Sequence, residues 1–488
     1  MNRILLRKFF FFLSISIAFV SCEKNTEFPV DIQANDFVWK GLNAYYLDQG
    51  TIDDLADARF SSDQQLEDYL TGFETPEDIF GALIIGSDTL STLVPDFNTL
   101  RGPEQRVVNT NGMEFGIIED PTNPDNVIGY VQLILPNSFA SIQPISRGDF
   151  FNEVNGEQLT RENYLGMLIG IGSPNDYQLT MVNFDGINVT PNGSFVFLSK
   201  QPYVYPAVFF EKVFNINASR VGYLAYHNDF SSFYLPDLNN AFGNLRSQNI
   251  TDLVIDLRYS IGKGSFAQNI AEIASMITGQ FENQVLIKEQ WNNKAQSWFS
   301  QNQPDSLLTR FPSTLSNNQT INGLGLNRVY IIANAYAYQS SSAIELLVNS
   351  LNPYIDVQVI GTPSNGYNKG FITLYDSPDY DFLDKNETHT YALQPRVLAF
   401  HNFNDVTYES GLSPTLQICP NEDYFNLGVY GELSDPLLNR VMDYVTTGNT
   451  GTNGICDPFN LEYIFNSTAG IGIERGVFIR QDLPNLGR

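Results

Sequence analysis

The stretch that decides the fold spans residues 331–375 and reads IIANAYAYQSSSAIELLVNSLNPYIDVQVIGTPSNGYNKGFITLY. An apolar run rich in β-branched residues, at 329–333, leads into small polar residues. Leu346, Leu347 and Leu351 then share one face of a predicted helix, and a second apolar run ends at Gly361. We therefore expect a βαβ unit in which the polar turn delivers the chain to a helix near Ser342.

Ser342 supports two interpretations. Ser342 and Glu345 have the spacing of a capping box, in which both side chains satisfy free amides at the start of a helix. A serine at a strand-to-helix turn also presents its hydroxyl beside helix N-terminal amides, which is where a hydrolase places a nucleophile. The spacing alone leaves both interpretations open.

Several positions of this stretch resemble the tail-specific (C-terminal-processing) serine peptidases. Ser342, Ala343 and Glu345 match three positions of the Ser-Ala-Ser-Glu signature, with Ile344 in place of the second serine. Gly361 and Gly366 fall into the family's register without a gap. The resemblance implies a peptidase domain of the ClpP/crotonase type, with Ser342 as the nucleophile of a Ser/Lys dyad.

The family's dyad lysine falls on Tyr367 in this chain, and the nearest lysine is Lys369. Residues two apart in a strand point to the same side and lie about 7 Å apart, so the resemblance makes Lys369 the candidate base. A phenol with a pKa of about 10 is a poor base at neutral pH. Tyr367 therefore favours the alternative of a catalytically inactive pseudo-peptidase.

The resemblance also implies an oxyanion hole. An apolar run at 253–257 predicts a second strand, and the family continues this strand with an Asn-x-Gly-Gly turn whose glycine amide binds the developing charge. Here the turn reads Ser-Ile-Gly-Lys at 260–263, so Gly262 is retained. The amides of Gly262 and Ala343 are the implied donors.

Residues 106–200 read as short β-runs punctuated by Gly, Pro and Asn. The Arg-Gly-Asp turn at 147–149 and the Val-Asn-Gly hairpin at 154–156 make this stretch resemble a PDZ domain. PDZ domains add a C-terminal peptide as a strand and bind its carboxylate on loop amides. The implied peptide-binding residues are Gly112, Phe115 and Gly116; a domain that only braces its neighbour is the alternative.

The first 22 residues resemble a bacterial lipoprotein signal peptide. Three basic residues precede an apolar segment too short to span a bilayer, and Phe-Val-Ser-Cys at 19–22 is similar to a lipobox. We expect lipid on Cys22 to anchor the protein in the cell envelope, with an ordinary secretory peptide as the alternative. Cys419 and Cys456 suit either a disulfide or two buried thiols.

The composition indicates which kinds of partner the protein is unsuited to bind. The 488 residues carry 27 basic and 54 acidic side chains, a formal net charge of −27, which disfavours binding to nucleic acid through a basic surface. His227, His389 and His401 lack metal-ligand spacing, and no cofactor motif is present, so we expect neither metal nor cofactor. A Ser-His-Asp triad using one histidine remains open.

The sequence thus predicts an α/β multidomain protein. The expected parts are a signal peptide at 1–22, a tether at 23–35, a helical N-terminal domain at 36–105, a PDZ-like domain at 106–200, a tail-specific peptidase domain at 201–447 and a C-terminal extension at 448–488. The expected function is a serine endopeptidase acting on the C-termini of extracytoplasmic proteins or peptides. The alternative is a pseudo-peptidase that binds peptides or envelope proteins without cutting them.

Overall fold

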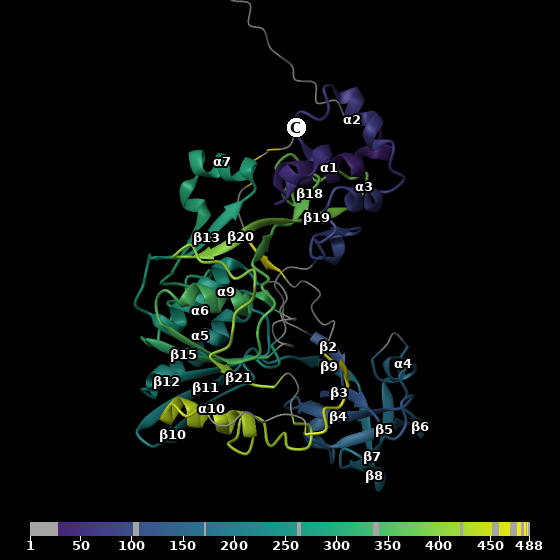
Figure 1. The fold of residues 1–488 in the computed structure, drawn as a ribbon, viewed down its shortest axis with the longest axis vertical. Coiled ribbons are helices and arrows are strands. Elements are labelled where there is room, and N and C mark those ends of the chain that lie inside the picture. The colour runs from purple at the N-terminus through teal and green to yellow at the C-terminus, as the bar shows by residue number, and fades with distance from the viewer. Residues whose placement is uncertain are drawn as a thin grey trace, which may run out of the picture.

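The computed structural model describes residues 28–100, 107–169, 172–260, 265–334, 341–419, 423–450, 458–468, 476–479, 483, 484 and 486. Cys22, Gly262 and Cys456 lie outside the described residues. Figure 1 shows helices α1 to α3 at one end of the molecule, a helix-covered sheet in the middle and a largely antiparallel sheet at the other end. The mixed α/β character expected from the sequence is confirmed.

The N-terminal region contains three α-helices. Its helices are α1 (Gln33–Tyr45), α2 (Asp63–Leu70) and α3 (Pro76–Ala82), and short 3-10 turns lie at Val30–Ile32, Gln49–Thr51, Asp53–Leu55 and Phe97–Thr99. Helix α3 begins with a capping box between Thr75 and Asp78. Phe37 and Trp39 of α1 belong to the same buried cluster as Leu346 of the middle region. The helices therefore share a core with the region they cover.

A small sheet also joins the N-terminal region to the rest of the chain. Strand β1 (Thr92–Val94) pairs with β19 (Ala392–Gln394), which pairs with β18 (Leu374–Tyr375). Residues about 300 positions apart in the sequence are thereby paired in one sheet, as the pairing of Thr92 with Gln394 shows.

The middle region is built on a six-stranded sheet of order β10-β11-β12-β15-β16-β21, here named the β12 sheet. Its strands are β10 (Phe210–Ile216), β11 (Ser219–Ala225), β12 (Asp252–Asp256), β15 (Arg328–Ala333), β16 (Asp356–Gly361) and β21 (Leu416–Gln417). Only β10 is antiparallel to its neighbour. Parallel strands need crossover helices, which are α5 (Leu235–Ser247), α6 (Ala267–Thr278) and α9 (Ser342–Leu351).

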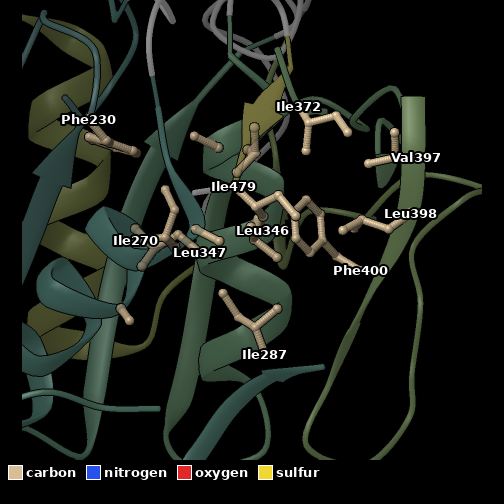
Figure 2. Close-up of a cluster of buried hydrophobic side chains, with 14 of the residues drawn as sticks. Phe230, Ile270, Ile287, Leu346, Leu347, Ile372, Val397, Leu398, Phe400 and Ile479 are labelled. Atoms are coloured by element: carbon tan, nitrogen blue, oxygen red, sulfur yellow. The ribbon is translucent and has the colours of Figure 1, made fainter. Parts of the chain in front are cut away.

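Side chains alternate across the β12 sheet, so both of its faces are buried. Ile331 contributes to the cluster on the side of α5, α6 and α9, whereas Tyr330 and Ile332 contribute to the cluster under α10 (Pro436–Thr447). Figure 2 shows Leu347 of α9 beside Ile270 of α6, and Leu346 toward Phe400 of β20. The leucine face that the sequence predicted for this helix is thus buried.

A second sheet packs against α9 and is named the β13 sheet. Its order is β14-β13-β20-β17-β23, with β13 (Val285–Trp291), β14 (Leu308–Arg310), β17 (Lys369–Phe371), β20 (Arg396–Asn402) and β23 (Val477–Phe478). Helix α7 (Asn293–Asn302) and a 3-10 turn at Pro304–Leu307 connect β13 to β14.

The third sheet, named the β3 sheet, covers most of the stretch predicted to be PDZ-like. Its order is β22-β3-β4-β5-β7-β8, and β6 pairs with β5. The strands are β3 (Met113–Glu119), β4 (Val127–Ile134), β5 (Phe150–Val154), β6 (Glu157–Gln158), β7 (Asp176–Phe184), β8 (Val189–Ser199) and β22 (Tyr463–Asn466). A 3-10 turn at Ala140–Ile142 and helix α4 (Tyr164–Leu168) complete it, and β2 (Val107–Thr110) pairs separately with β9 (Gln201–Val204).

Candidate active site

Ser342 is the first residue of α9, and its exposed fraction is 2%. Ser341 occupies the cap position, and its side chain makes no capping hydrogen bond. The capping box between Ser342 and Glu345 is therefore wrong, because Glu345 binds a different segment of the chain. The helix start that the sequence predicted at this serine is confirmed.

The fully buried carboxylate of Glu345 holds the loop that follows β16. It accepts hydrogen bonds from the amides of Gly366 at 2.6 Å and Tyr367 at 2.9 Å, and from the hydroxyl of Ser364. Burial raises the pKa of Glu345, and these hydrogen bonds oppose the rise. The backbone at Tyr367, the family's lysine position, is thereby held by a side chain from the first turn of α9.

Tyr367 and Lys369 follow this loop. Tyr367 is half-buried, and Lys369 opens strand β17. The Lys369 ammonium lies 2.5 Å from the Glu409 carboxylate, whose side chain is 57% exposed. The hydrogen bond from Lys369, followed by its charge, lowers the pKa of Glu409. Asn368, between the two, is buried and donates to the Thr407 hydroxyl at 2.5 Å.

The chain after β12 leads toward the expected oxyanion hole. Ser260 is buried and its hydroxyl donates to the backbone oxygen of Asn228 at 3.0 Å. Gly262 follows outside the described residues, so its amide stays a prediction. Ala343, the other expected donor, lies in the first turn of α9 and is 1% exposed.

A buried cluster of charged side chains lies at the end of β12, and the sequence did not predict it. Arg258, which is 1% exposed, donates to Asp256 at 2.8 Å and to Asp435 at 2.7 Å. Burial lowers the pKa of Arg258, but the two carboxylates outweigh it and raise the pKa well above its usual value. Asp435 also caps α10 by accepting from the amides of Leu437 and Leu438. The 177 positions between Arg258 and Asp435 explain why no local pattern reveals the pair.

Two of the histidines bind other partners. The Nε2 atom of His227 lies 2.8 Å from the Tyr430 hydroxyl, and that of His389 lies 3.0 Å from an Asp376 oxygen. His401 lies on β20, which neighbours the strand that carries Lys369. Among the described residues, no group of His, Cys, Asp or Glu side chains could hold a metal ion.

The three residues expected to bind peptide lie along β3 and at its start. Gly112 has a φ of +88° and precedes the strand, and Phe115 and Gly116 lie within it. The Phe115 amide donates to the Ser467 hydroxyl at 2.9 Å, and the Phe115 oxygen accepts from the Ser467 amide at 2.8 Å. Gly116 is paired with Asn466 of β22. The chain itself therefore supplies a strand at this edge.

The C-terminal extension also contacts the sheet that carries Lys369. Strand β23 runs parallel to β17, with Gly370 opposite Val477. The Phe478 amide donates to the Ser265 oxygen at 2.8 Å, and the Ile479 amide donates to the Phe371 oxygen at 3.0 Å. This segment thus bridges β17 and the residues that follow the expected oxyanion turn.

Cys419 is disulfide-bonded, and its partner lies outside the described residues. Within the described part of the chain, no helix is long and apolar enough to cross a membrane.

Comparison with solved structures shows which known fold this chain is similar to. No family model and no curated protein sequence matches the chain. A protein assigned as an S41 protease from Bacteroides fragilis superposes with a TM-score of 0.63 at 20% identity, over 84% of this chain and 97% of that one. The photosystem II D1 C-terminal processing protease gives a TM-score of 0.46 at 14% identity, over 84% and 97% of the two chains. Mature CPAF gives 0.42 at 13%, over 87% and 99%.

The TM-score of the Bacteroides fragilis structure is high enough to show the fold. The chain has the S41 protease fold, which is the fold that the resemblance to the tail-specific serine peptidases predicts.

Proposed function

We propose that this protein is a pseudo-peptidase of the tail-specific fold, which binds extended polypeptide segments without cutting them. The observation that carries the proposal is the pairing of the Lys369 ammonium with Glu409 at 2.5 Å. An ammonium that donates to a carboxylate has three donors and no lone pair, so it cannot accept the proton of a serine hydroxyl. Tyr367, at the family's lysine position, offers only a phenol, which is a poor base at neutral pH.

A second candidate is a serine endopeptidase acting on protein C-termini. It is favoured by the position of Ser342 at the start of α9, beside the amide of Ala343. In this candidate Ser342 is the nucleophile, Lys369 is the base, and the amides of Ala343 and Gly262 form the oxyanion hole. The ion pair with Glu409 is partly exposed, and such pairs contribute at most about 1 kcal/mol, so Lys369 would be released at a modest cost.

A cleavage assay distinguishes the two candidate functions. Its substrate is an unfolded protein with an accessible C-terminus. We expect no cleavage by the wild-type protein. If Ser342 is a working nucleophile, Ser342→Ala and Lys369→Ala should each abolish cleavage, and the double variant should lose no more than either one. Lys288→Ala is the matched control, because Lys288 also pairs with a carboxylate, that of Asp405 at 2.7 Å, on a neighbouring part of the same sheet. Cleavage by the wild type that depends on Ser342 would contradict the pseudo-peptidase.

We further infer that lipid on Cys22 holds the protein at the cell envelope. The sequence pattern at 1–22 supports this inference, because three basic residues and a short apolar segment precede the lipobox-like Phe-Val-Ser-Cys at 19–22. Cys22→Ala should move the mature protein from the membrane fraction to the soluble fraction. Ser21→Ala, which keeps a small residue before the cysteine, should leave it on the membrane.

A further inference from the structure

We infer that the β3 edge is a strand-binding site whose resident ligand is the chain's own segment 462–467, bound as an internal strand and not through a C-terminal carboxylate. This inference rests on the proposed polypeptide binding, for which it names the site and the class of ligand. It does not depend on Ser342, which lies at the start of helix α9 and not on the β3 sheet.

The backbone of the segment pairs with β3 along its length, with a register shift between Tyr463 and Phe465. Strand β22 is antiparallel to β3, with Tyr463 opposite Ile118 and Asn466 opposite Gly116. Outside this ladder, the Glu119 amide donates to the Glu462 oxygen at 3.0 Å, and Phe115 and Ser467 exchange two hydrogen bonds. In Figure 1 the yellow, late part of the chain lies beside β3. This is the geometry of strand addition to a sheet edge.

The side chains of residues 464–466 make contacts that depend on the sequence of the bound strand. The Phe465 ring lies 5.6 Å from the Tyr164 ring of α4, and Ile464 packs against the core of the β3 sheet. Asn466 is 2% exposed, and its Nδ2 atom donates to the Gln132 oxygen at 2.6 Å. These contacts with α4 and the β3 sheet therefore favour an aromatic residue followed by an asparagine.

The loop that would capture a carboxylate is already satisfied internally. The Gly112 amide donates to the Thr110 hydroxyl at 3.1 Å, and the Met113 amide donates to the Asn111 side chain at 2.9 Å. The bound segment also continues past Ser467 into Thr468, whose amide donates to the Asn466 side chain at 2.8 Å. The site therefore accepts a strand that runs through it.

The resident strand is short and partly exposed to solvent, so we expect it to dissociate from β3 without unfolding of the sheet. Strand β22 has 4 residues, and Tyr463 is 38% exposed. The ion pair between Arg161 and Glu462 is exposed as well. A tethered segment competes at an effective concentration of roughly millimolar, so a separate strand binds only when the resident one is weakened or displaced. Occupancy by residues 462–467 thus regulates access to the site.

The test is fluorescence anisotropy of a labelled peptide with the sequence of residues 461–468, LEYIFNST, titrated with the full-length protein. Ser467→Pro removes both hydrogen bonds to Phe115, and Phe465→Ser removes the ring that faces Tyr164. Either variant should bind the peptide at least ten-fold more tightly than wild type does. Tyr463→Ser, an exposed position of the same strand, should bind it as weakly as wild type.

The amidated and free-acid peptides should bind the loosened variants equally well, and a copy with serine at the position of Phe465 should not bind. Equal affinity of the wild type and both variants, or no binding by either variant, would overturn the inference. A ten-fold preference for the free acid would show that the site binds a C-terminal carboxylate, and would overturn the claim that it binds an internal strand. A Ser342-dependent cleavage activity would refute the pseudo-peptidase and leave these binding results unchanged.

Hydrogen exchange of the wild-type protein provides a measurement that does not depend on a variant. The amides of Phe115 and Ser467 should exchange faster than those of β4 and β7, because release of residues 462–467 opens them without unfolding the sheet. Exchange of these amides only at the rate of global unfolding would show that β22 is a permanent strand, and would overturn the inference.

Discussion

Glu345 and Asp36 are both buried carboxylates in the first turn of a helix, but their partners differ. Glu345 accepts three hydrogen bonds from the loop that contains Tyr367. Asp36 has Lys40 at 2.5 Å, and its other oxygen has no hydrogen-bond partner among the described residues. Burial raises the pKa of Asp36 to about 6, although Lys40 partly offsets the rise. Glu345 thus organises a loop, whereas Asp36 binds only Lys40 through one oxygen among the described residues.

The pKa of Asp36 gives a direct prediction. Because the folded state holds this proton more tightly than the unfolded chain does, the stability that protonation contributes is fully present below pH ~4 and is lost as the pH rises through about 6. The full difference is at most about 3 kcal/mol. Denaturant unfolding between pH 4 and 8 should therefore show a smaller loss of stability on raising the pH for Asp36→Asn than for wild type.

Asp305→Asn, whose side chain is 91% exposed, is the control for the pH titration and should follow the wild-type curve. A curve for Asp36→Asn that runs parallel to wild type would show that Asp36 does not titrate in this range.

At the scale of elements, the contact between β15 and β16 positions both sides of the Ser342 centre. Ala333 at the end of β15 leads toward Ser342, and Gly361 at the end of β16 leads toward the loop held by Glu345. The two residues are paired, and a Cβ atom on Gly361 would lie 1.7 Å from the Ala333 oxygen. The glycine is required because any side chain would separate the strand ends.

Gly361→Ala should therefore lower the free energy of unfolding by about 1–3 kcal/mol, through displacement of the strand ends. Gly81→Ala is the matched control: Gly81 lies in α3 and a Cβ there would meet nothing within 4 Å. That substitution should raise stability by about 0.4–1 kcal/mol, because alanine reduces the freedom of the unfolded chain. Denaturant unfolding measures both, and equal effects would contradict the close approach.

At the scale of the whole molecule, Arg147 joins the β3 sheet to the β12 sheet. Its guanidinium donates to the Tyr259 hydroxyl at 2.7 Å and to the backbone oxygen of Gln132, and it lies 5.7 Å from the Tyr430 ring centre. The C-terminal extension adds further links through β22 and β23, and the Tyr45 hydroxyl donates to the Pro484 oxygen. These contacts tie the three regions seen in Figure 1 to one another.

Arg147→Met should weaken the junction while leaving the core of each sheet intact. Loss of the charged hydrogen bonds should cost about 1.5–3 kcal/mol and broaden or split the thermal transition seen by calorimetry. Arg310→Met, which removes an arginine that is 41% exposed, should change stability by no more than about 0.5 kcal/mol. An unchanged transition in Arg147→Met would show that the junction does not depend on this side chain.

The sequence by itself determined the features that depend on neighbouring residues. The apolar runs around Ser342 specify the βαβ unit, and the spacing of its leucines specifies the buried face of α9, because both periods are local properties of the backbone. The resemblance to the tail-specific peptidases was carried by a similarly short stretch, and the fold agrees with it. The capping box at Ser342 was wrong because Glu345 finds its partners about 20 positions away.

Only the tertiary structure decided which distant groups meet. Nothing near Lys369 in the sequence indicates Glu409, and nothing near Arg258 indicates Asp435, because those pairs form when separate elements pack. Residues 463–466 look like any short β-run, and their place on β3 depends on the edge of that strand and on the contact of Phe465 with Tyr164 of α4. Strand pairing uses backbone groups that every residue carries, so the sequence does not name the partner, and packing selects it.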